Sequence, residues 1–403
     1  MRLSGRLRPR APADETVPAS NTLLATIARY ARSTYRLRRG NQVRILRAGG
    51  EAFPAMIAAI SAARTSISFE TYIYEHDGTG QRFADALIER ARAGVTIRFI
   101  VDAIGGFGMD AAFVARLREA GIQMLEYHPV APWRKRFNLV NRDHRKILVI
   151  DDEVGFTGGI NIGDEYAAVS DGGAGWHDVH CELRGPVVID LARVFRRTWL
   201  GEGGAPYPAP AYPRDDAERP GTIAARVVDN SKRRRRGAIR RAYLNAISAA
   251  QQTIWIENAY FLPDRGLRRA LARAVARGVE VAVIVPGKND VQAIRYAGLY
   301  LYGKLAARGI KVLRWRGPMM HAKTAVIDGV WTCIGSYNLD SRSFRYNLEV
   351  VVEVLDDQIG AEMQRQFTSD RAATDAFDPL SWSRLPWYRR LLSWMAFQVH
   401  GWL

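Results

Sequence analysis

"DHRKILVIDDEVGFTGGIN", residues 143–161, is the stretch that decides the fold of this 403-residue chain, because the chain nearly repeats it as "MHAKTAVIDGVWTCIGSYN" at residues 320–338. Seven positions are identical, each found again 177 residues later, and five of them are polar residues or glycine. Those five are His144, Lys146, Asp151, Gly158 and Asn161, which recur as His321, Lys323, Asp328, Gly335 and Asn338. In both copies the histidine and the lysine precede an apolar run that is typical of a buried strand. The repeat predicts two structurally similar halves.

The segments around the repeat match in the same order. A buried-strand pattern at 65–74 resembles the one at 252–261, and a helix followed by a strand at 84–102 resembles 268–286. Strands that alternate with amphipathic helices predict an α/β fold, and a repeat of this length indicates domains rather than a solenoid. We expect two similar lobes, each with a central mixed β-sheet flanked by helices, related by a pseudo-twofold axis with the active site at their junction.

Composition divides the chain into five parts. In order, they are a basic N-terminal segment (1–41), the first lobe (42–202), a proline-rich linker (203–222), the second lobe (223–370) and a tryptophan-rich tail (371–403). Within the first part, residues 22–40 have the pattern of a basic amphipathic helix. The tail has four of the ten tryptophans. Tryptophan beside leucine, phenylalanine and arginine is typical of a membrane-interface anchor, and the alternative is a helix packed on its own lobe.

The balance of charge indicates an anionic partner. The net charge is +17, which suits a nucleic acid, a phospholipid surface or a phosphorylated substrate. No run of 18 or more apolar residues occurs, and no apolar stretch follows the basic start, so neither a transmembrane helix nor a cleaved signal peptide is expected. A soluble or peripheral protein is the prediction.

The repeated motif has the side chains that phosphate chemistry needs. Because side chains alternate along a strand, His144 and Lys146 face one side while Arg145 faces the other. If His321 and Lys323 join them at the junction, one imidazole can attack phosphorus and the other can protonate the departing oxygen. The two ammonium groups would neutralise the equatorial oxygens. Asn161 and Asn338 could donate further hydrogen bonds to them. No metal and no cofactor is expected, since no carboxylate cluster suited to a metal is visible in the sequence.

A single histidine in an apolar strand is more often an ordinary core residue than a catalyst. Frequency favours catalysis here, because the chain has 7 His and 7 Lys against 51 Arg. Chance predicts roughly 0.1 His-x-Lys pairs in such a chain, yet two occur, at equivalent places. Arginine would serve a surface strand equally well, whereas a compact ammonium fits beside a phosphoryl oxygen.

The two copies resemble a known signature. "HRKILVID" and "HAKTAVID", followed by "GGIN" and "GSYN", are similar to the His-x-Lys-x4-Asp motif of the phospholipase D superfamily in its two-motif form. "ETYIY", "WHDVHCELRGPVV", "AYFLPD" and "GSYNLDSRSFRYNLE" resemble bacterial cardiolipin synthases, in the shorter branch without transmembrane helices. The resemblance covers about residues 42–370 and implies two phospholipase D-like lobes.

The resemblance also implies a reaction. A phosphatidyl group would pass from one phospholipid to a histidine, and then to an alcohol of phosphatidylglycerol. It implies that His144 is the nucleophile and His321 the general acid and base, although the residues alone leave this order open. The implied partners are phospholipids, namely phosphatidylglycerol with phosphatidylethanolamine as a second candidate, and an anionic membrane surface. The implied location is peripheral, on the cytoplasmic side of a bacterial inner membrane.

Other acids take roles by the same resemblance. Asp178 and Glu349, on the strand after each motif, would orient the histidine rings. Asp151 and Asp328 complete the catalytic signature, although their position at the far strand ends indicates a structural role. In the second asparagine loop, Asp340 and Arg342 are expected to pair.

Two other functions stay open. The first is a phospholipase D-type hydrolase or a phosphodiesterase or nuclease of the same superfamily, which the positive charge would suit. The second is a non-catalytic membrane-binding protein that keeps the fold, which two complete motifs disfavour. The tryptophan-rich tail favours lipid over nucleic acid as the partner, because a nucleic-acid binder would more often interleave basic and aromatic residues within a groove. The oligomeric state is not predicted.

Overall fold

The structure is a computed structural model of the chain. It describes residues 36–212, 218–231, 236–288, 291–378 and 384–398, together with Ala25, Leu380 and Trp382. The amphipathic helix expected at 22–40 lies mostly outside the described residues, and its last three residues belong to a strand that begins at Arg38. Within the described residues, no helix is both long and apolar enough to cross a membrane.

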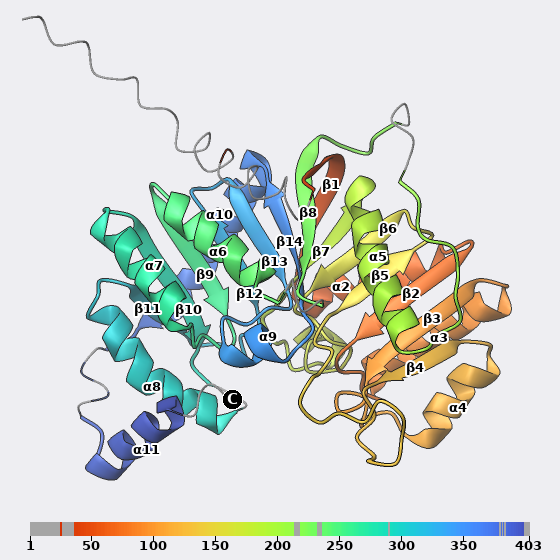
Figure 1. Cartoon of the computed structure of the whole chain (residues 1–403), viewed down its shortest axis with the longest axis horizontal. Helices are drawn as coiled ribbons and strands as arrows, with labels where there is room; N and C mark the ends of the chain where they lie inside the picture. The colour runs from red at the N-terminus through yellow and green to blue at the C-terminus, as the bar shows by residue number, and fades with distance from the viewer. Residues whose placement is uncertain are drawn as a thin grey trace, which may run out of the picture.

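A single β-sheet of fifteen strands runs through both lobes (Figure 1). From the centre outward, the first lobe contributes β1 (Arg38–Arg47), β7 (Val179–Arg184), β6 (Val154–Gly158), β5 (Ile147–Ile150), β2 (Ser66–Thr71), β3 (Thr96–Asp102) and β4 (Gln123–Tyr127). The second lobe contributes β8 (Ile223–Asp229), β14 (Val350–Leu355), β13 (Trp331–Gly335), β12 (Lys323–Ile327), β9 (Thr253–Asn258), β10 (Glu280–Pro286), β11 (Lys311–Trp315) and β15 (Thr374–Ala376). Apart from β15, the two halves have the same strand order, which confirms the two equivalent lobes.

The two sheets expected from the sequence are joined edge to edge. Strands β1 and β8, the first of each lobe, pair antiparallel at the centre. In each lobe the three outer repeat strands, β2–β3–β4 and β9–β10–β11, are parallel, and the motif strands β5 and β12 run antiparallel to β2 and β9. Each sheet is therefore mixed, as predicted.

Helices cover both faces of each half. The first lobe has α2 (Ala48–Ser61), α3 (Gly78–Arg92), α4 (Ala111–Glu119) and α5 (Pro186–Gly201), with a 3-10 turn at Val169–Asp171. The second lobe has α6 (Ala238–Ala249), α7 (Arg265–Ala276), α8 (Gln292–Ala306), α9 (Ser341–Arg345), α10 (Asp357–Ala372) and α11 (Trp387–Gln398). Side chains of α2 and α3 pack in one apolar core, and those of α5 pack in another, which α5 shares with α10 of the second lobe.

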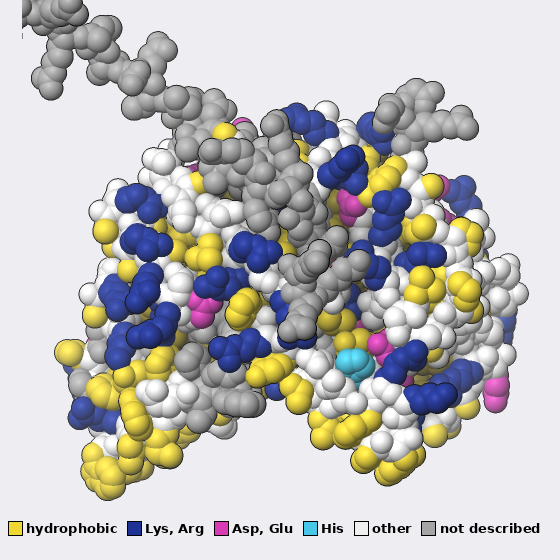
Figure 2. Space-filling model, in the orientation of Figure 1, with side chains coloured by type: hydrophobic (Ala, Val, Ile, Leu, Met, Phe, Trp, Pro, Cys, Tyr) yellow, Lys and Arg dark blue, Asp and Glu magenta, His cyan; other side chains and the backbone are white. Residues whose placement is uncertain are grey.

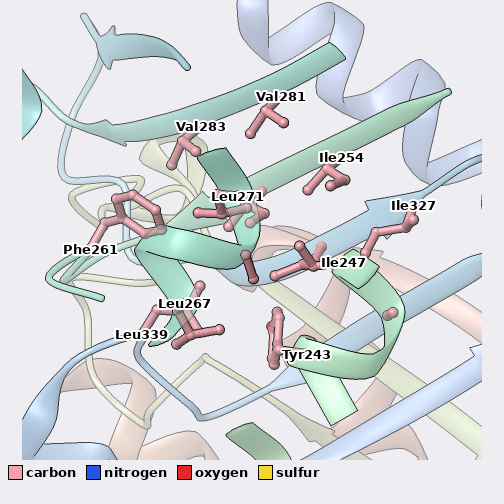
Figure 3. Close-up of a cluster of buried hydrophobic side chains, with 14 of the residues drawn as sticks. Tyr243, Ile247, Ile254, Phe261, Leu267, Leu271, Val281, Val283, Ile327 and Leu339 are labelled. Carbon is pink, nitrogen blue, oxygen red and sulfur yellow. The ribbon is translucent and has the colours of Figure 1, made fainter. Parts of the chain in front are cut away.

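The second lobe shows how these cores are built. Tyr243 and Ile247 of α6, with Leu267 and Leu271 of α7, point at the sheet and meet apolar side chains of β9, β10 and β12 (Figure 3). Because helices cover both faces, every residue of β12 and β13 is buried, and these strands show no alternation of apolar and polar residues between two faces.

The residues that begin and end helices are also equivalent in the two lobes. Aspartates 77 and 264 cap α3 and α7 by accepting hydrogen bonds from backbone N–H groups of the first turn. Gly94 and Gly278 follow the same two helices with φ of +91° and +89°, a left-handed conformation that favours glycine. Equivalent start and stop signals explain why both helix–strand units could be predicted from the sequence.

The segment boundaries differ from those predicted. Strand β1 begins at Arg38, inside the part expected to be a separate N-terminal segment. Strand β15 pairs with β11, so the second lobe continues past residue 370 into the predicted tail. The described linker residues contain no helix or strand, but they lie against α5. There Arg196 donates to the carbonyl of Tyr207 (2.6 Å) and Trp199 Nε1 to the carbonyl of Ala205 (2.9 Å).

Candidate active site

Both motif histidines line one cavity at the junction of the lobes, with a volume of about 460 Å³. His144 and Asn161 come from the first lobe, and His321 and Asn338 from the second. The structure thus brings together four of the side chains that the sequence predicted to meet. A cavity between two domains is a common place for a binding site.

Backbone hydrogen bonds across the junction position each histidine. The N–H of His144 donates to the carbonyl of Leu348 in the second lobe (3.0 Å). In the equivalent contact, the N–H of His321 donates to the carbonyl of His177 in the first lobe (2.7 Å). Short parallel bridges at Asp143–Leu348 and His177–Met320 accompany these bonds. Neither histidine is held by its own lobe alone.

The carboxylates are exchanged between the lobes in the same way. His144 Nδ1 lies 3.2 Å from Glu349 Oε2, and His321 Nδ1 lies 2.8 Å from Asp178 Oδ2. All four side chains are buried. An ionised carboxylate only accepts, so each Nδ1 carries a hydrogen and each Nε2 is left as the basic nitrogen. The sequence assigned each acid to the strand after a motif, and the structure pairs each with the histidine of the opposite motif.

The electrostatics of the site keep both rings neutral. Burial, followed by the nearby Lys323, lowers the pKa of His321 to about 4. Burial and Lys146 lower the pKa of His144 in the same direction. Although burial opposes ionisation of Asp178, Lys323 and His321 outweigh it and lower the pKa of this carboxyl. Two neutral imidazoles beside ionised carboxylates are suited to nucleophilic and acid–base chemistry.

The two motif lysines lie directly behind the histidines. Lys146 Nζ donates to the carbonyl of His144 (2.7 Å), and Lys323 Nζ lies 2.8 Å from His321 Nδ1. Both are almost fully buried. Burial, together with repulsion from Lys323, lowers the pKa of Lys146 to about 7. This mutual repulsion would be relieved by an anion, so the pair favours a phosphate group in the cavity.

The two asparagines have different surroundings. Asn161 Nδ2 donates to the hydroxyl of Tyr166 (2.7 Å), and its Oδ1 accepts from the N–H of Ile73 (3.3 Å). Asn338 also lines the cavity, and its buried Oδ1 has no hydrogen-bond partner among the described residues. An amide oxygen only accepts hydrogen bonds, so Asn338 Oδ1 suits a donor such as a ligand hydroxyl and not a phosphoryl oxygen.

A glycine and a serine at equivalent positions distinguish the two lobes. A Cβ at Gly159 would lie 2.1 Å from the Asp178 carboxylate, so no side chain fits there. The equivalent Ser336 has a side chain, and its hydroxyl donates to Glu349 Oε2. Glu349 therefore divides its acceptor capacity between Ser336 and His144, whereas Asp178 Oδ2 faces His321 at the shorter distance.

Asp151 and Asp328 lie at the other ends of their strands and are absent from the cavity lining. Asp151 accepts from the backbone N–H groups of residues 64, 65 and 66, at 2.8–2.9 Å. Asp328 accepts from those of residues 251, 252 and 253, each at 2.8 Å. The geometry therefore corrects their inclusion among the catalytic side chains, because each ties its motif strand to the start of the neighbouring strand.

The cavity also has an aromatic wall that sequence reasoning missed. The ring centroid of Tyr72 lies 5.0 Å from that of His144. The ring centroids of Tyr166, Trp176 and Tyr260 lie 5.5–6.3 Å from that of His321. A signal was present, since Tyr72 directly follows β2, Tyr260 lies two residues after the end of β9, and Trp176 lies two residues before Asp178, which directly precedes β7. These rings form an apolar surround for the polar centre.

The expected pairing of Arg342 with Asp340 was also wrong. Both residues line the cavity, and Asp340 also caps α9 by accepting from the N–H of Ser343 (2.7 Å). No ion pair joins Asp340 to Arg342 in the described part of the chain. The sequence motif is a helix cap, which frees the arginine to face a ligand.

Among the described residues, His177, Glu257 and Asp370 form a group of metal-ligand type. His177 Nε2 lies 3.2 Å from Asp370 and 3.9 Å from Glu257. Burial opposes protonation of His177, but the carboxylates of Asp370 and Glu257 outweigh it and raise its pKa to about 10. With a protonated ring, the three residues form a buried ion cluster. In the first lobe, Arg145 neutralises the equivalent Glu70 at 2.8 Å.

Comparison with known proteins agrees with this geometry. The family model described as "Cardiolipin synthase, PLD-like domain" matches residues 56–171 and 243–371, more than half of the chain. Cardiolipin synthase A of Pseudomonas aeruginosa is 37% identical over 340 residues, which cover 84% of this chain and 69% of that protein. Cardiolipin synthase A of Pseudomonas fluorescens is 35% identical over 336 residues, 82% of this chain and 69% of that one.

The fold has a solved counterpart. A phosphatidylserine synthase from Haemophilus influenzae Rd KW20 superposes with a TM-score of 0.72 at 15% identity, covering 94% of this chain and 100% of that one. At this identity the likeness concerns the fold alone. The sequence relatives and the family model decide the rest: the chain belongs to the cardiolipin synthase family, whose members have phospholipase D-like domains, and it is an enzyme of the phospholipase D-type phosphatidyltransferase class.

Proposed function

We propose that the protein makes cardiolipin, by transferring a phosphatidyl group through a phosphohistidine to an alcohol of phosphatidylglycerol. The observation that carries the proposal is the pair of histidines in one cavity, each with Nδ1 fixed by a carboxylate of the opposite lobe. Two such imidazoles are what a two-step displacement at phosphorus requires.

In the first step, Nε2 of one histidine attacks the phosphorus of the donor lipid, a P–N bond forms, and the P–O bond to the headgroup alcohol breaks. The second histidine, which takes up a proton at Nε2 when the anionic substrate is bound, gives that proton to the departing oxygen. In the second step, the same histidine removes the proton from an alcohol of phosphatidylglycerol, whose oxygen then displaces the first histidine. Lys146 and Lys323 stabilise charge on the phosphoryl oxygens throughout, with Arg342 at the cavity wall.

The nucleophile is assigned to His144 and the acid–base role to His321. The resemblance to phospholipase D implies this order, and the carboxylate geometry supports it. An acid–base histidine must become an imidazolium, which a close carboxylate stabilises. Asp178 lies 2.8 Å from His321, whereas Glu349 lies 3.2 Å from His144 and also accepts from Ser336.

Lipid substrates require the cavity to reach a bilayer, and two apolar patches support docking on an anionic membrane. Figure 2 shows hydrophobic side chains gathered along the lower edge of both lobes, where Figure 1 places α11 and the loops after β3 and β4. In those loops, Phe107, Phe137, Leu139 and Val140 are exposed and Trp133 is 85% exposed.

On α11 the exposed side chains include Leu391, Leu392, Trp394, Met395 and Trp387, the last 74% exposed. This helix also packs on α8, where Phe397 meets Tyr300 at 4.9 Å between ring centroids. The tail thus combines the two alternatives, a packed helix and an exposed apolar face. Placement on the cytoplasmic side of a bacterial inner membrane stays a prediction from the sequence.

The test is product analysis with purified full-length protein and phosphatidylglycerol vesicles, with and without phosphatidylethanolamine. Mass spectrometry should detect cardiolipin together with glycerol, or with ethanolamine if the second lipid is also a donor. The variant His144→Ala, matched by His321→Ala, should abolish transfer without unfolding the protein, which circular dichroism checks. Phosphatidic acid as the sole product would show a hydrolase, and faster cleavage of DNA than of lipid would show a nuclease.

A further inference from the structure

A second cavity, larger than the catalytic one, lies on the second lobe between α7, α8, α9 and α11. Its volume is about 1060 Å³. It shares no lining residue with the catalytic cavity. Helix α9 separates the two, because Ser341 and Arg345 face the larger cavity while Arg342 faces the catalytic one. Nothing in the proposed transfer reaction uses this space.

The lining of this cavity, which we call the arginine cavity, is strongly cationic. Its basic side chains are Arg240, Arg265, Arg268, Arg269, Lys304, Arg308 and Arg345. The acid in the lining is Asp264, and its carboxylate is already engaged. It accepts from Arg240 (2.9 Å) and from the capping N–H groups of Gly266 (2.6 Å) and Leu267 (3.1 Å). Six cations of the lining thus have no carboxylate partner among the described residues.

Crowding of like charges makes this arrangement costly unless an anion binds. Arg268 is the central case, since its guanidinium is half-buried at the wall of the cavity. Burial, followed by repulsion from Arg308 and Arg265, lowers the pKa of Arg268. Guanidinium groups bind phosphate oxygens with paired N–H donors, so several arginines around one cavity favour a phosphate over a carboxylate or a halide.

The apolar side of the same cavity indicates that the phosphate belongs to a lipid. Phe397 of α11 lines the cavity, and the guanidinium of Arg268 lies 5.3 Å from its ring centroid. The same helix has the exposed Trp387, Leu391 and Met395. Figure 2 shows Lys and Arg side chains gathered over α7, above the hydrophobic lower-left edge that α11 forms. A ligand with a phosphate at one end and hydrocarbon at the other matches both surfaces.

We propose that the arginine cavity binds the phosphate group of an anionic phospholipid in the bilayer, and so seats the second lobe on the membrane at a site separate from catalysis. The inference rests on the proposed function and deepens it, since it names the lipid contact that holds the catalytic cavity at headgroup level. The α11 side chains then enter the interface beside the bound lipid. Attachment by a phosphate site plus an apolar helix supplies the two signals that stable docking requires.

The test compares full-length protein with the variant Arg268→Gln/Arg308→Gln. Its control is Arg92→Gln/Arg273→Gln, which removes the same charge from two exposed helical arginines outside the cavity. Binding is measured by co-sedimentation with phosphatidylcholine vesicles that contain or lack phosphatidylglycerol. The cavity variant should bind phosphatidylglycerol vesicles about tenfold or more weakly than the intact protein, with the control within about threefold.

Three outcomes would overturn the inference. The first is unchanged vesicle binding by the cavity variant, and the second is an equal loss in the control, which would indicate general surface charge. The third is a loss of duplex DNA binding in the cavity variant with vesicle binding intact, which would indicate a nucleic-acid site. Glycerophosphoglycerol, measured by calorimetry on the intact protein and the cavity variant, separates the two sources of phosphate. A loss of its binding in the cavity variant as large as the loss of vesicle binding would assign the cavity to a soluble ligand.

Activity in detergent distinguishes this inference from the proposed function. The cavity variant should keep the transfer rate of the intact protein on detergent-dispersed phosphatidylglycerol and lose rate on vesicles. If the intact protein itself makes no cardiolipin in detergent, the proposed function is wrong, and the vesicle-binding comparison still decides the inference. Circular dichroism melting of both variants verifies that each is folded.

Discussion

The exchange of carboxylates between the lobes has a direct kinetic consequence. Replacing Asp178 by Asn keeps the size of the side chain but removes the charge that faces His321 at 2.8 Å in a fully buried position. Loss of one partner of a buried ion pair costs about 3–5 kcal/mol. His321 is neutral without substrate and becomes an imidazolium only when the anionic substrate is bound, so this cost falls on the reaction and not on the stability of the free protein. At 1.36 kcal/mol per tenfold in rate, Asp178→Asn should slow transfer by about 10²- to 10⁴-fold.

The reaction step that each carboxylate variant slows shows which histidine that carboxylate serves. A phosphatidyl ester whose leaving group departs without a proton needs no general acid. With such an ester as the substrate, the Asp178→Asn variant should form the phosphohistidine at the normal rate and then accumulate it, as the His321→Ala variant should. Glu349→Gln should instead slow formation of the phosphohistidine, as His144→Ala should abolish it. Intact-protein mass spectrometry after rapid quenching measures both. The pairing is refuted if Asp178→Asn follows His144→Ala, or if both carboxylate variants turn over like the intact enzyme.

Three further predictions concern the remaining side chains. Asp151→Asn places an amide against the backbone N–H groups of residues 64–66. Urea unfolding should therefore show a free energy of unfolding lower by about 1–3 kcal/mol, with kcat of the folded enzyme unchanged. A variant that is inactive but fully stable would restore Asp151 to the catalytic set. Burial and Lys323 lower the pKa of Lys146 to about 7, so Lys146 is protonated below that pH and loses its charge above it. The affinity for glycerophosphoglycerol, measured by calorimetry, should therefore fall from pH 6 to pH 8. An unchanged affinity would contradict the assignment. Chelation by EDTA should leave the transfer rate unchanged, because lysines supply the positive charge, and a loss that one added divalent ion restores would contradict this.

The sequence allowed most of the fold to be predicted because its signals are local and doubled. Each helix–strand unit has its own cap, its own apolar periodicity and its own glycine stop, so two copies gave the same answer independently. The alternation argument at the first motif also held, since Arg145 points away from His144 and Lys146 and binds Glu70 on the other side of the strand. Buried strands with such patterns leave little choice of face.

What the sequence could not supply is the relation between the two copies. Nothing in the order of residues indicates that β1 and β8 pair edge to edge, or that Asp178 serves His321 rather than His144. Both facts depend on how two separately predictable lobes dock. The aromatic wall was missed for a related reason, since Tyr72 and Tyr260 follow buried strands and have the composition of ordinary core residues until the lobes meet around them.

The docking of the lobes also explains why the motif must be present twice for one site. Each motif supplies a histidine, a lysine and an acid, but it cannot orient its own ring, because its acid points across the junction. Its histidine is also fixed by a backbone carbonyl of the other lobe. A lobe on its own would therefore hold a buried imidazole and ammonium without the carboxylate that balances them, an arrangement that burial alone penalises. Catalytic geometry and the stability of the interface depend on the same four buried side chains, His144, Glu349, His321 and Asp178, so a change that weakens one weakens the other.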